Sequence, residues 1–184
     1  SQKDIAVIRL FVGIPIPADI KSHLSMMSAG LPGARWVNEE NYHLTLRFIG
    51  EVDEGLAGDI DITLGQINHP TLELSLEGVG YFGKPNAARA VWAGVAKSEN
   101  LLHLHAKIEM ALQRMGQPAE ERKYTPHITL ARMRGTPKAK LDEYIAGHMG
   151  FAAGPIAVRS FTLFSSFLSS SGAIYIPEAN YTLG

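Results

Sequence analysis

Hydrophobic and polar residues along this chain are arranged in segments that predict both helices and strands. Apolar residues recur at helical spacing in several segments, which begin near proline or a capping residue or end at glycine. These helices are predicted over residues 17–29, 53–67 (with Asp53 as N-cap), 100–115 and 137–148. Strands are predicted where β-branched and apolar residues cluster or alternate with polar ones. They cover residues 5–14, 41–49, 71–77, 88–95, 126–132, 155–168 and 172–183.

The order of these elements indicates the fold class. Glycine and proline at residues 80–86 predict a turn or loop, and Ser169–Gly172 predicts a hairpin turn. Because many strand connections are hairpin-like, an α+β fold with antiparallel sheets and flanking helices is favoured over a parallel, doubly wound sheet. No low-complexity linker interrupts the chain. We therefore expect a single two-lobed domain over residues 1–184.

Two of the predicted strands carry the same short pattern of residues. His43-Leu44-Thr45-Leu46 and His127-Ile128-Thr129-Leu130 both read His-x-Thr-x with apolar residues in the gaps. Successive side chains on a strand point to opposite faces, so each histidine shares a face with its threonine. The equivalent places of the two strands suggest a pseudo-twofold, with the motifs facing each other across a central cleft. Two imidazoles and two hydroxyls there would suit acid–base chemistry at a phosphate.

Residues just beyond the motifs are weaker candidates for binding substrate. Strict alternation places Arg47 on the face of His43, where it would meet a phosphate, form an ion pair or be solvated. Alternation places Arg132 on the opposite face from His127, so it reaches the site only if the strand ends or bulges near Ala131. Strict alternation likewise places Phe48 on the opposite face from His43. At a strand end its ring would be able to stack on a base.

Composition narrows the class of protein and of chemistry. The 184 residues include 46% hydrophobic and 19% charged residues, with a net charge of −1, so nothing global marks an electrostatic nucleic-acid binder. Cysteine is absent, which excludes disulfides, thiolate nucleophiles and cysteine zinc sites. No apolar run is long enough for a membrane span, and the N-terminus lacks the features of a signal peptide. We expect a cytoplasmic protein that has no membrane association.

The remaining histidines do not predict a metal site. His103 and His105 are two residues apart on a predicted helix, so their side chains diverge too far to bind one ion. No cluster of aspartates accompanies either motif, and no phosphate-binding loop, dinucleotide fingerprint or serine nucleophile elbow is present. We expect neither a metal nor another cofactor.

The paired motifs, with the residues around them, resemble the 2H phosphoesterase superfamily. Within it, the chain is similar to the RNA 2′,3′-cyclic phosphodiesterases, also described as 2′-5′ RNA ligase-like proteins. The resemblance covers nearly the whole chain. It includes the opening strand from Arg9, Arg35-Trp36-Val37, residues 41–52 around the first motif, Ala90–Gly94 and Tyr124–Arg132 around the second. Glu39-Glu40 departs from the family pattern, which often has proline or small residues there.

The resemblance implies a fold and distinct roles for the site residues. It implies a bilobal α+β fold with the motifs on central strands of two antiparallel sheets. It implies a metal-independent hydrolase with His43 as proton donor and His127 as proton acceptor. In similar proteins the arginine matching Arg132 helps to hold phosphate, and the phenylalanine matching Phe48 can stack on a base.

The expected reaction is hydrolysis of a 2′,3′-cyclic phosphate at an RNA 3′ end to a 2′-phosphomonoester. Thr45 and Thr129 would donate hydrogen bonds to the non-bridging oxygens. RNA 3′ ends or cyclic nucleotides are the expected partners of a monomeric enzyme. Two alternatives use the same site: a 2′-5′ phosphodiesterase or RNA-end ligase, and a nucleotide-binding module without turnover. A zinc hydrolase is a further class, which metal analysis of the protein would test.

Overall fold

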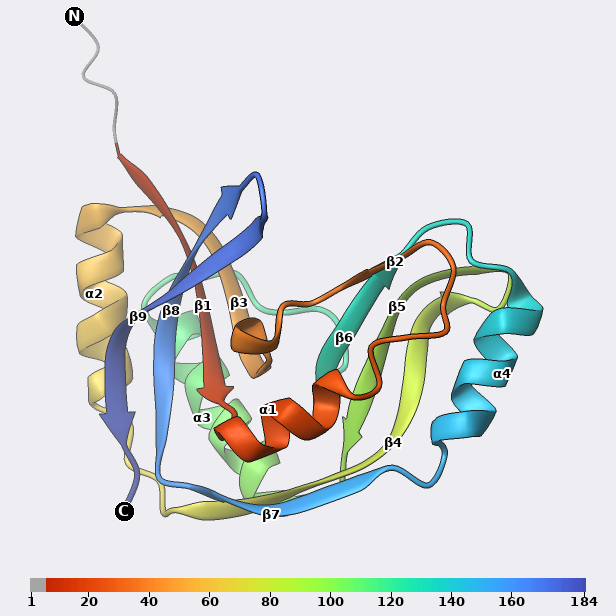
Figure 1. The fold of residues 1–184 in the computed structure, drawn as a ribbon. Coiled ribbons are helices and arrows are strands. Elements are labelled where there is room, and N and C mark those ends of the chain that lie inside the picture. The colour runs from red at the N-terminus through yellow and green to blue at the C-terminus, as the bar shows by residue number, and fades with distance from the viewer. Residues whose placement is uncertain (1–5) are drawn as a thin grey trace, which may run out of the picture.

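A computed structural model describes residues 6–184 of the chain as two lobes joined side by side (Figure 1). The expected absence of a signal peptide and the start of the first predicted strand at Ile5 depend on residues outside this range. The elements follow one another as β1 (Val7–Pro15), α1 (Ala18–Ser25), β2 (Ala34–Trp36), a 3-10 turn η1 (Glu39–Asn41), β3 (His43–Asp53), α2 (Glu54–Gly65), β4 (Leu72–Lys84), β5 (Ala87–Val95), α3 (Glu99–Arg114), β6 (His127–Met133), α4 (Lys138–His148), β7 (Ala152–Val158), β8 (Ser160–Ser169) and β9 (Gly172–Thr182).

The strands form two sheets, and all their pairings are antiparallel. The four-stranded sheet has the order β3-β1-β8-β9, and the five-stranded sheet has the order β2-β6-β5-β4-β7. The strands β3 and β6, which carry the two motifs, belong to different sheets and lie next to each other where the lobes meet (Figure 1). The α+β class and the two antiparallel sheets are therefore as expected from the sequence.

The placement of the motif strands differs in one respect from what the resemblance implies. β3 is at the edge of its sheet, and β6 is one strand in from an edge. Neither is a central strand. The edge position of β3 lets it meet β6 across the boundary between the lobes.

The helices cover the apolar faces of the sheets. α2 and α3 pack on β1 and β3 of the four-stranded sheet, and α4 packs on β4 of the five-stranded sheet (Figure 1). Leu44 and Leu46 of β3 are buried on the covered face, as are Ile128 and Leu130 of β6. These residues belong to one apolar core that includes both sheets. Burial of one face of each strand leaves the histidines and threonines on the other, as the alternation predicts.

The strand predicted over residues 155–168 is wrong, because the chain there forms two strands in different sheets. β7 pairs with β4 in the five-stranded sheet, whereas β8 pairs with β1 and β9 in the four-stranded sheet. The switch falls at Arg159, whose carbonyl oxygen accepts a hydrogen bond of 2.8 Å from the backbone N–H of Leu183. No glycine or proline marks this point, but the polar pair Arg159-Ser160 interrupts the apolar run, and the alternation of Ile156 and Val158 does not continue in phase at Phe161 and Leu163.

The turn or loop predicted over residues 80–86 is confirmed only at residues 85–86, because β4 continues to Lys84. Gly80 is a strand residue that pairs with Trp92 on β5. A Cβ atom at this position would lie 2.3 Å from Cη2 of the Trp92 ring. Glycine is required here by the close approach of an aromatic ring and not by a turn.

Glycine is similarly misleading at the predicted end of the first motif strand. β3 passes through Gly50 and ends at Asp53. Ile49 has no partner on β1, and Gly50 next to it has a φ of +94°. Glycine accommodates the left-handed conformation of this bulge, after which pairing resumes. The predicted N-cap is confirmed, since the Asp53 carboxylate accepts a hydrogen bond of 2.8 Å from the N–H of Leu56.

No helix within residues 6–184 has the length and apolar character that crossing a membrane requires.

Candidate active site

The His43 ring is held in one orientation by two hydrogen bonds. Its Nδ1 atom lies 2.8 Å from the carbonyl oxygen of Asn41, and its Nε2 atom lies 2.8 Å from Oγ1 of Thr45. A carbonyl oxygen only accepts, so Nδ1 carries a hydrogen in every protonation state that keeps this bond. Nε2 is then the nitrogen that gains or loses a proton, and the Thr45 hydroxyl can serve it as donor or acceptor.

The His127 ring on the other lobe has the backbone half of this arrangement. Its Nδ1 atom lies 2.6 Å from the carbonyl oxygen of Thr125, again two residues before the histidine. Nε2 is therefore the exchangeable nitrogen in both rings. A pair of imidazoles whose tautomers are fixed in the same way is suited to giving a proton at one end of a reaction and taking one at the other.

Each motif strand bulges at the fourth residue of its motif. On β3, Thr45 pairs with Gly13 and Arg47 with Val12, which leaves Leu46 without a partner. On β6, Thr129 pairs with Trp92 and Ala131 with Val91, which leaves Leu130 without one. An extra residue reverses the alternation of faces beyond it.

The two bulges decide where Phe48 and Arg132 lie. Both are the fifth residue after a motif histidine, and strict alternation would bury them. In the structure Phe48 is 45% exposed. Arg132 is also exposed, and both residues line the same cleft. On the sequence alone, Arg132 reaches the site only if the strand ends or bulges near Ala131. The bulge at Leu130 meets this requirement.

A cleft of about 1,020 Å³ lies between the two motif strands. Five of the candidate residues line it, and these are Thr45, Arg47, Phe48, His127 and Arg132. His43 and Thr129 are half-buried and are not among its lining residues. The charge of His127 nevertheless lowers the pKa of His43, as expected for two imidazoles that share one site.

Aromatic side chains surround both imidazoles. The His43 ring centroid lies 4.7 Å from that of Phe11 and 5.2 Å from that of Tyr175. The His127 ring has its edge contact with Phe82, at 4.8 Å between centroids, and lies 6.0 Å from Trp92. These rings exclude water from one side of each histidine.

Burial lowers the pKa of both histidines below the usual 6.5. For His43 the hydrogen bond to Asn41 opposes this effect, and the charges of His127 and Lys21 add to it. For His127 the hydrogen bond to Thr125 opposes it, and the charge of Arg132 adds to it. Both rings are therefore predominantly neutral at pH 7 in the absence of an anion.

Arg47 lines the cleft, but its guanidinium is bound to protein groups. Nε donates to Oε2 of Glu109 at 2.5 Å, Nη1 donates to the carbonyl oxygen of Phe48 at 2.6 Å, and Nη2 donates to the carbonyl oxygen of Pro118. The ion pair is nearly buried, with side-chain exposures of 7% and 15%. The sequence left open whether Arg47 would meet a phosphate, form an ion pair or be solvated. In the structure it forms an ion pair with Glu109.

Glu109 is held as a carboxylate by this network. Burial would raise its pKa, but the hydrogen bonds from Arg47, the N–H of Glu120 and the side chain of Gln113 outweigh it and lower the pKa to about 2. The pair ties α3 and the loop before β6 to the strand that carries His43.

Comparison with known proteins places the chain in a family. The sequence profile of LigT like Phosphoesterase matches residues 14–92 and 94–175. The chain belongs to the LigT-like phosphoesterase family. Both motifs lie within the matched ranges, one in each.

Several LigT-like relatives match over most of their length. The RNA 2′,3′-cyclic phosphodiesterase of Aeropyrum pernix is 35% identical over 153 residues, which cover 82% of this chain and 86% of the relative. The RNA 2′,3′-cyclic phosphodiesterase of Thermotoga maritima is 34% identical over 174 residues, or 91% of each chain. The crystal structure of E. coli LigT complexed with 3′-AMP superposes with a TM-score of 0.79 at 27% identity, covering 97% of this chain and 99% of that one.

The LigT-like fold also places residues at the site to which the sequence gave no role. Tyr124 donates a hydrogen bond of 2.9 Å to the carbonyl oxygen of Thr45, so it joins the loop before His127 to the other motif. Phe82 lines the cleft from the end of β4, within the segment taken for a loop. The position of Tyr124 three residues before His127 was a signal for its importance, whereas nothing in the sequence pointed to Phe82.

No group of three or more histidines, aspartates and glutamates is placed to hold a metal ion in the part of the chain that the structure describes. The expectation of a reaction without metal thus stays a prediction for experiment.

Proposed function

We propose that this protein hydrolyses the 2′,3′-cyclic phosphate at RNA 3′ ends to a 2′-phosphomonoester, with His43 and His127 as acid and base. The observation that carries the proposal is the matched fixing of the two rings. Each has Nδ1 bound to a carbonyl oxygen and Nε2 left for proton transfer, on strands that meet across one cleft. The names of relatives that are 34% and 35% identical support the choice of substrate.

The proposed reaction needs one proton taken and one proton given. Nε2 of neutral His127 accepts a proton from water as the water oxygen forms a bond to phosphorus. The bond from phosphorus to the 3′ oxygen breaks, and Nε2–H of His43 donates a proton to that oxygen. The 2′ oxygen keeps its bond to phosphorus, so the product is a 2′-phosphomonoester beside a free 3′ hydroxyl.

Hydroxyl and guanidinium groups would stabilise the charge that develops on the non-bridging oxygens. Thr45 can accept a hydrogen bond from protonated His43 and donate its own hydrogen to the phosphate. Thr129 would act in the same way beside His127. Arg132 is exposed in the cleft with no ion-pair partner among residues 6–184, so its guanidinium is available to the phosphate.

Two further parts of the proposal concern the rest of the substrate and the state of the protein. Phe48 presents an exposed ring on which a base can stack. We place the enzyme in the cytoplasm as a monomer, because its substrate is RNA and each chain contains both motifs.

The test is incubation of the purified protein with uridine 2′,3′-cyclic phosphate in EDTA, with separation of 2′- from 3′-phosphate products. We expect the 2′-phosphate alone, at a rate that EDTA does not change. His43→Ala or His127→Ala should lower kcat by about 10²–10⁴-fold. Full activity of the double variant would overturn the proposal. Loss of activity in EDTA that returns with zinc would indicate a metal hydrolase.

The same assay separates the alternatives that share this site. Cleavage of 2′-5′ oligoadenylate in preference to cyclic ends would indicate a 2′-5′ phosphodiesterase. Joined products from RNA ends would indicate ligation. Tight binding of the cyclic nucleotide with no product would indicate a binding module.

A further inference from the structure

The cleft contains more positive charge than one cyclic phosphate requires. Besides Arg47, which is paired with Glu109, four basic side chains line it: Arg89, Arg122, Lys123 and Arg132. None of these four is in an ion pair within residues 6–184. Glu120 is the single acidic residue among those that line the cleft. The protein as a whole has a net charge of −1, so these cations are gathered here rather than spread evenly.

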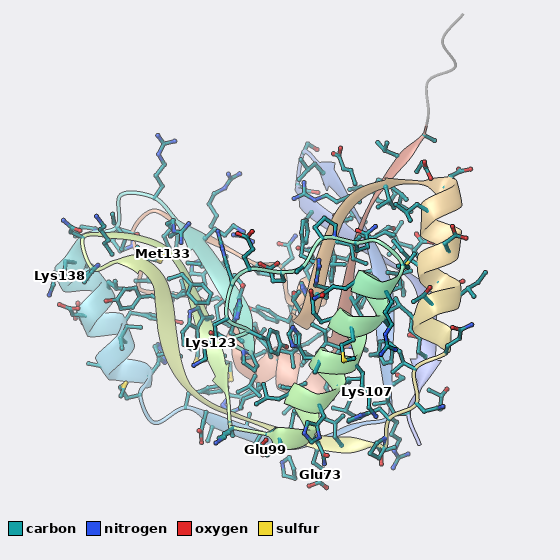
Figure 2. All side chains as sticks on the ribbon, turned by 180° about the vertical axis from the view of Figure 1, so that it is seen from behind. Glu73, Glu99, Lys107, Lys123, Met133 and Lys138 are labelled. Atoms are coloured by element: carbon teal, nitrogen blue, oxygen red, sulfur yellow. The ribbon has the colours of Figure 1, made fainter. Side chains whose placement is uncertain are left out.

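The volume of the cleft is also large for a single nucleotide. Small-molecule sites commonly have about 300–1,000 Å³. The cleft has about 1,020 Å³ and extends from His127 and Thr45 to the loop between α3 and β6. Lys123 on this loop lines the cleft and is labelled in Figure 2 over the strands of the five-stranded sheet. A terminal cyclic phosphate carries one negative charge, whereas an RNA chain adds one with every further nucleotide.

The loop that carries Arg122 and Lys123 is fixed on both sides of them. Before them, the carbonyl oxygen of Pro118 accepts from Arg47, and the N–H of Glu120 donates to Glu109 at 2.9 Å. After them, the Tyr124 hydroxyl donates to the carbonyl oxygen of Thr45. The Tyr124 ring also stacks on His105 of α3, with ring centroids 3.8 Å apart and planes at 3°.

Such anchoring gives the two exposed cations a defined place relative to the reacting groups. Thr45 and Tyr124 join the loop directly to the first motif, and the loop runs on into the second. Cations on an anchored loop lose less conformational freedom on binding than cations on a free one. Phosphate contacts of this kind set the register of a nucleic acid without reading its sequence.

We propose that Arg122 and Lys123, with Arg89 across the cleft, form a second phosphate subsite for the linkage one nucleotide upstream of the cyclic end. The proposal rests on the function proposed above and makes an RNA chain, rather than a cyclic mononucleotide, the preferred substrate. Arg132 serves the terminal phosphate, and the loop cations serve the internal one.

The experiment compares three substrates that end in the same cyclic phosphate. They are uridine 2′,3′-cyclic phosphate, the dinucleotide UpU with a 2′,3′-cyclic end, and the same dinucleotide with an uncharged methylphosphonate linkage. We expect kcat/KM to be about tenfold higher for the charged dinucleotide than for the other two, from two or three exposed ionic contacts. Its dependence on salt should be steeper, with the slope of log kcat/KM against log salt more negative by about 0.7.

Variants assign this effect to the loop. The Arg122→Gln/Lys123→Gln variant should remove the advantage of the charged dinucleotide and its extra salt dependence, and change the cyclic mononucleotide less than twofold. Arg134→Gln is the matched control, since it removes the charge of an exposed arginine that does not line the cleft. Equal rates for the charged and the uncharged dinucleotide in the wild type would overturn the subsite.

Binding without turnover separates this inference from the proposed function. Calorimetric titration with uridine 2′-phosphate and with UpU bearing a 2′-phosphate measures the same subsite even in a protein that hydrolyses none of the substrates. Tighter binding of the dinucleotide, lost in the double variant, supports the subsite whatever the reaction. Equal affinities would contradict it, while a lack of hydrolysis with intact binding would contradict the function alone.

Discussion

The two histidines are equivalent in their backbone hydrogen bonds and differ in their neighbours. Their Nδ1 atoms are bound to carbonyl oxygens at 2.8 and 2.6 Å, which fixes Nε2 as the working nitrogen in each. Burial lowers the pKa of both rings, so the neutral form of each predominates at pH 7 in the free protein. An anionic substrate would favour the imidazolium form and raise both values.

The pH dependence of the reaction follows from these shifts. In kcat/KM the acidic limb reports His127, which must be neutral, and the basic limb reports His43, which must be protonated. Both pKa values lie below 6.5 in the free protein, so the optimum of kcat/KM should lie on the acidic side of 6.5. The optimum of kcat should be higher, because bound phosphate raises both values. Initial rates at a series of pH values check this, and an alkaline optimum of kcat/KM would contradict it.

Substitution of an aromatic residue beside one histidine should shift only one limb of the pH profile of kcat/KM. Phe82 contacts His127 and has no contact with the His43 ring among those of the described residues. Phe82→Leu should admit water to His127 and raise its pKa toward 6.5, so the acidic limb of kcat/KM moves to higher pH. The basic limb should stay in place. Movement of both limbs together would show that the rings do not act separately on the histidines.

Arg47 illustrates a residue whose surroundings the sequence could not predict. Alternation assigns it to the face of His43, but the bulge at Leu46 reverses the alternation, and the side chain is nearly buried against Glu109, far along the chain on α3. Arg47→Met leaves the nearly buried Glu109 carboxylate without its partner, and should lower the free energy of unfolding by about 3 kcal/mol at pH 7. Urea denaturation measures this change. Arg47→Met/Glu109→Leu should recover most of the loss, and a double variant as unstable as the single one would count against the ion pair.

The contribution of this ion pair should depend on pH in a defined direction. Folding lowers the pKa of Glu109 from 4.5 to about 2, so its stabilisation is complete above 4.5 and is lost as the pH falls toward 2. The stability difference between the wild type and Glu109→Gln should therefore shrink below pH 4.5. A difference that stays constant over this range would mean that Glu109 has its ordinary pKa in the folded protein.

At the scale of elements, most strands and helices could be predicted, because their apolar periodicity reflects burial against one core. Irregular points within strands could not be predicted in the same way. The bulges at Leu46 and Leu130 fall on apolar residues that look like any other core position, yet they determine the exposure of Phe48 and Arg132. At the sheet switch, the polar pair Arg159-Ser160 marks a break in the apolar pattern, but which sheet each half joins depends on which distant strand offers a partner.

Substitution of Gly80 tests whether the close packing of the Trp92 ring requires glycine at this strand position. Gly80→Ala places a Cβ within 2.3 Å of the Trp92 ring, so the ring must move, and we expect a loss of about 1–3 kcal/mol in the free energy of unfolding. Displacement of Trp92, which adjoins His127, should also lower kcat. Gly58→Ala in α2 is the control, because nothing lies within 4 Å of its Cβ and alanine favours a helix. Equal stability of the two variants would contradict the close packing.

At the scale of the whole molecule, the chain passes between the lobes several times. β1 and β3 belong to one sheet and β2, between them in sequence, to the other, and the chain returns to the first sheet with β8. One apolar core includes residues of both sheets. The two-lobed shape therefore does not divide the chain into two segments that can fold separately.

Unfolding should then be a single event. We expect one calorimetric transition, with a van't Hoff enthalpy equal to the calorimetric enthalpy. Uridine 2′-phosphate should move the whole transition to higher temperature, because it binds only the folded protein. Two transitions, of which the ligand shifts one, would instead indicate two independent domains.

The bulges have a consequence for the direction of the proposed reaction. The two motifs carry identical chemical groups, an imidazole and a hydroxyl each, and a site with two equal halves has no reason to move protons one way rather than the other. The reversed alternation brings a different fifth residue into each half, a neutral ring from Phe48 and a cation from Arg132. The cation beside His127 lowers its pKa and so keeps the ring neutral before the reaction, the form in which it can accept a proton. The leaving oxygen and the attacking water are distinguished, in this view, by the fifth residue after each histidine, where the two motif strands carry side chains of different charge.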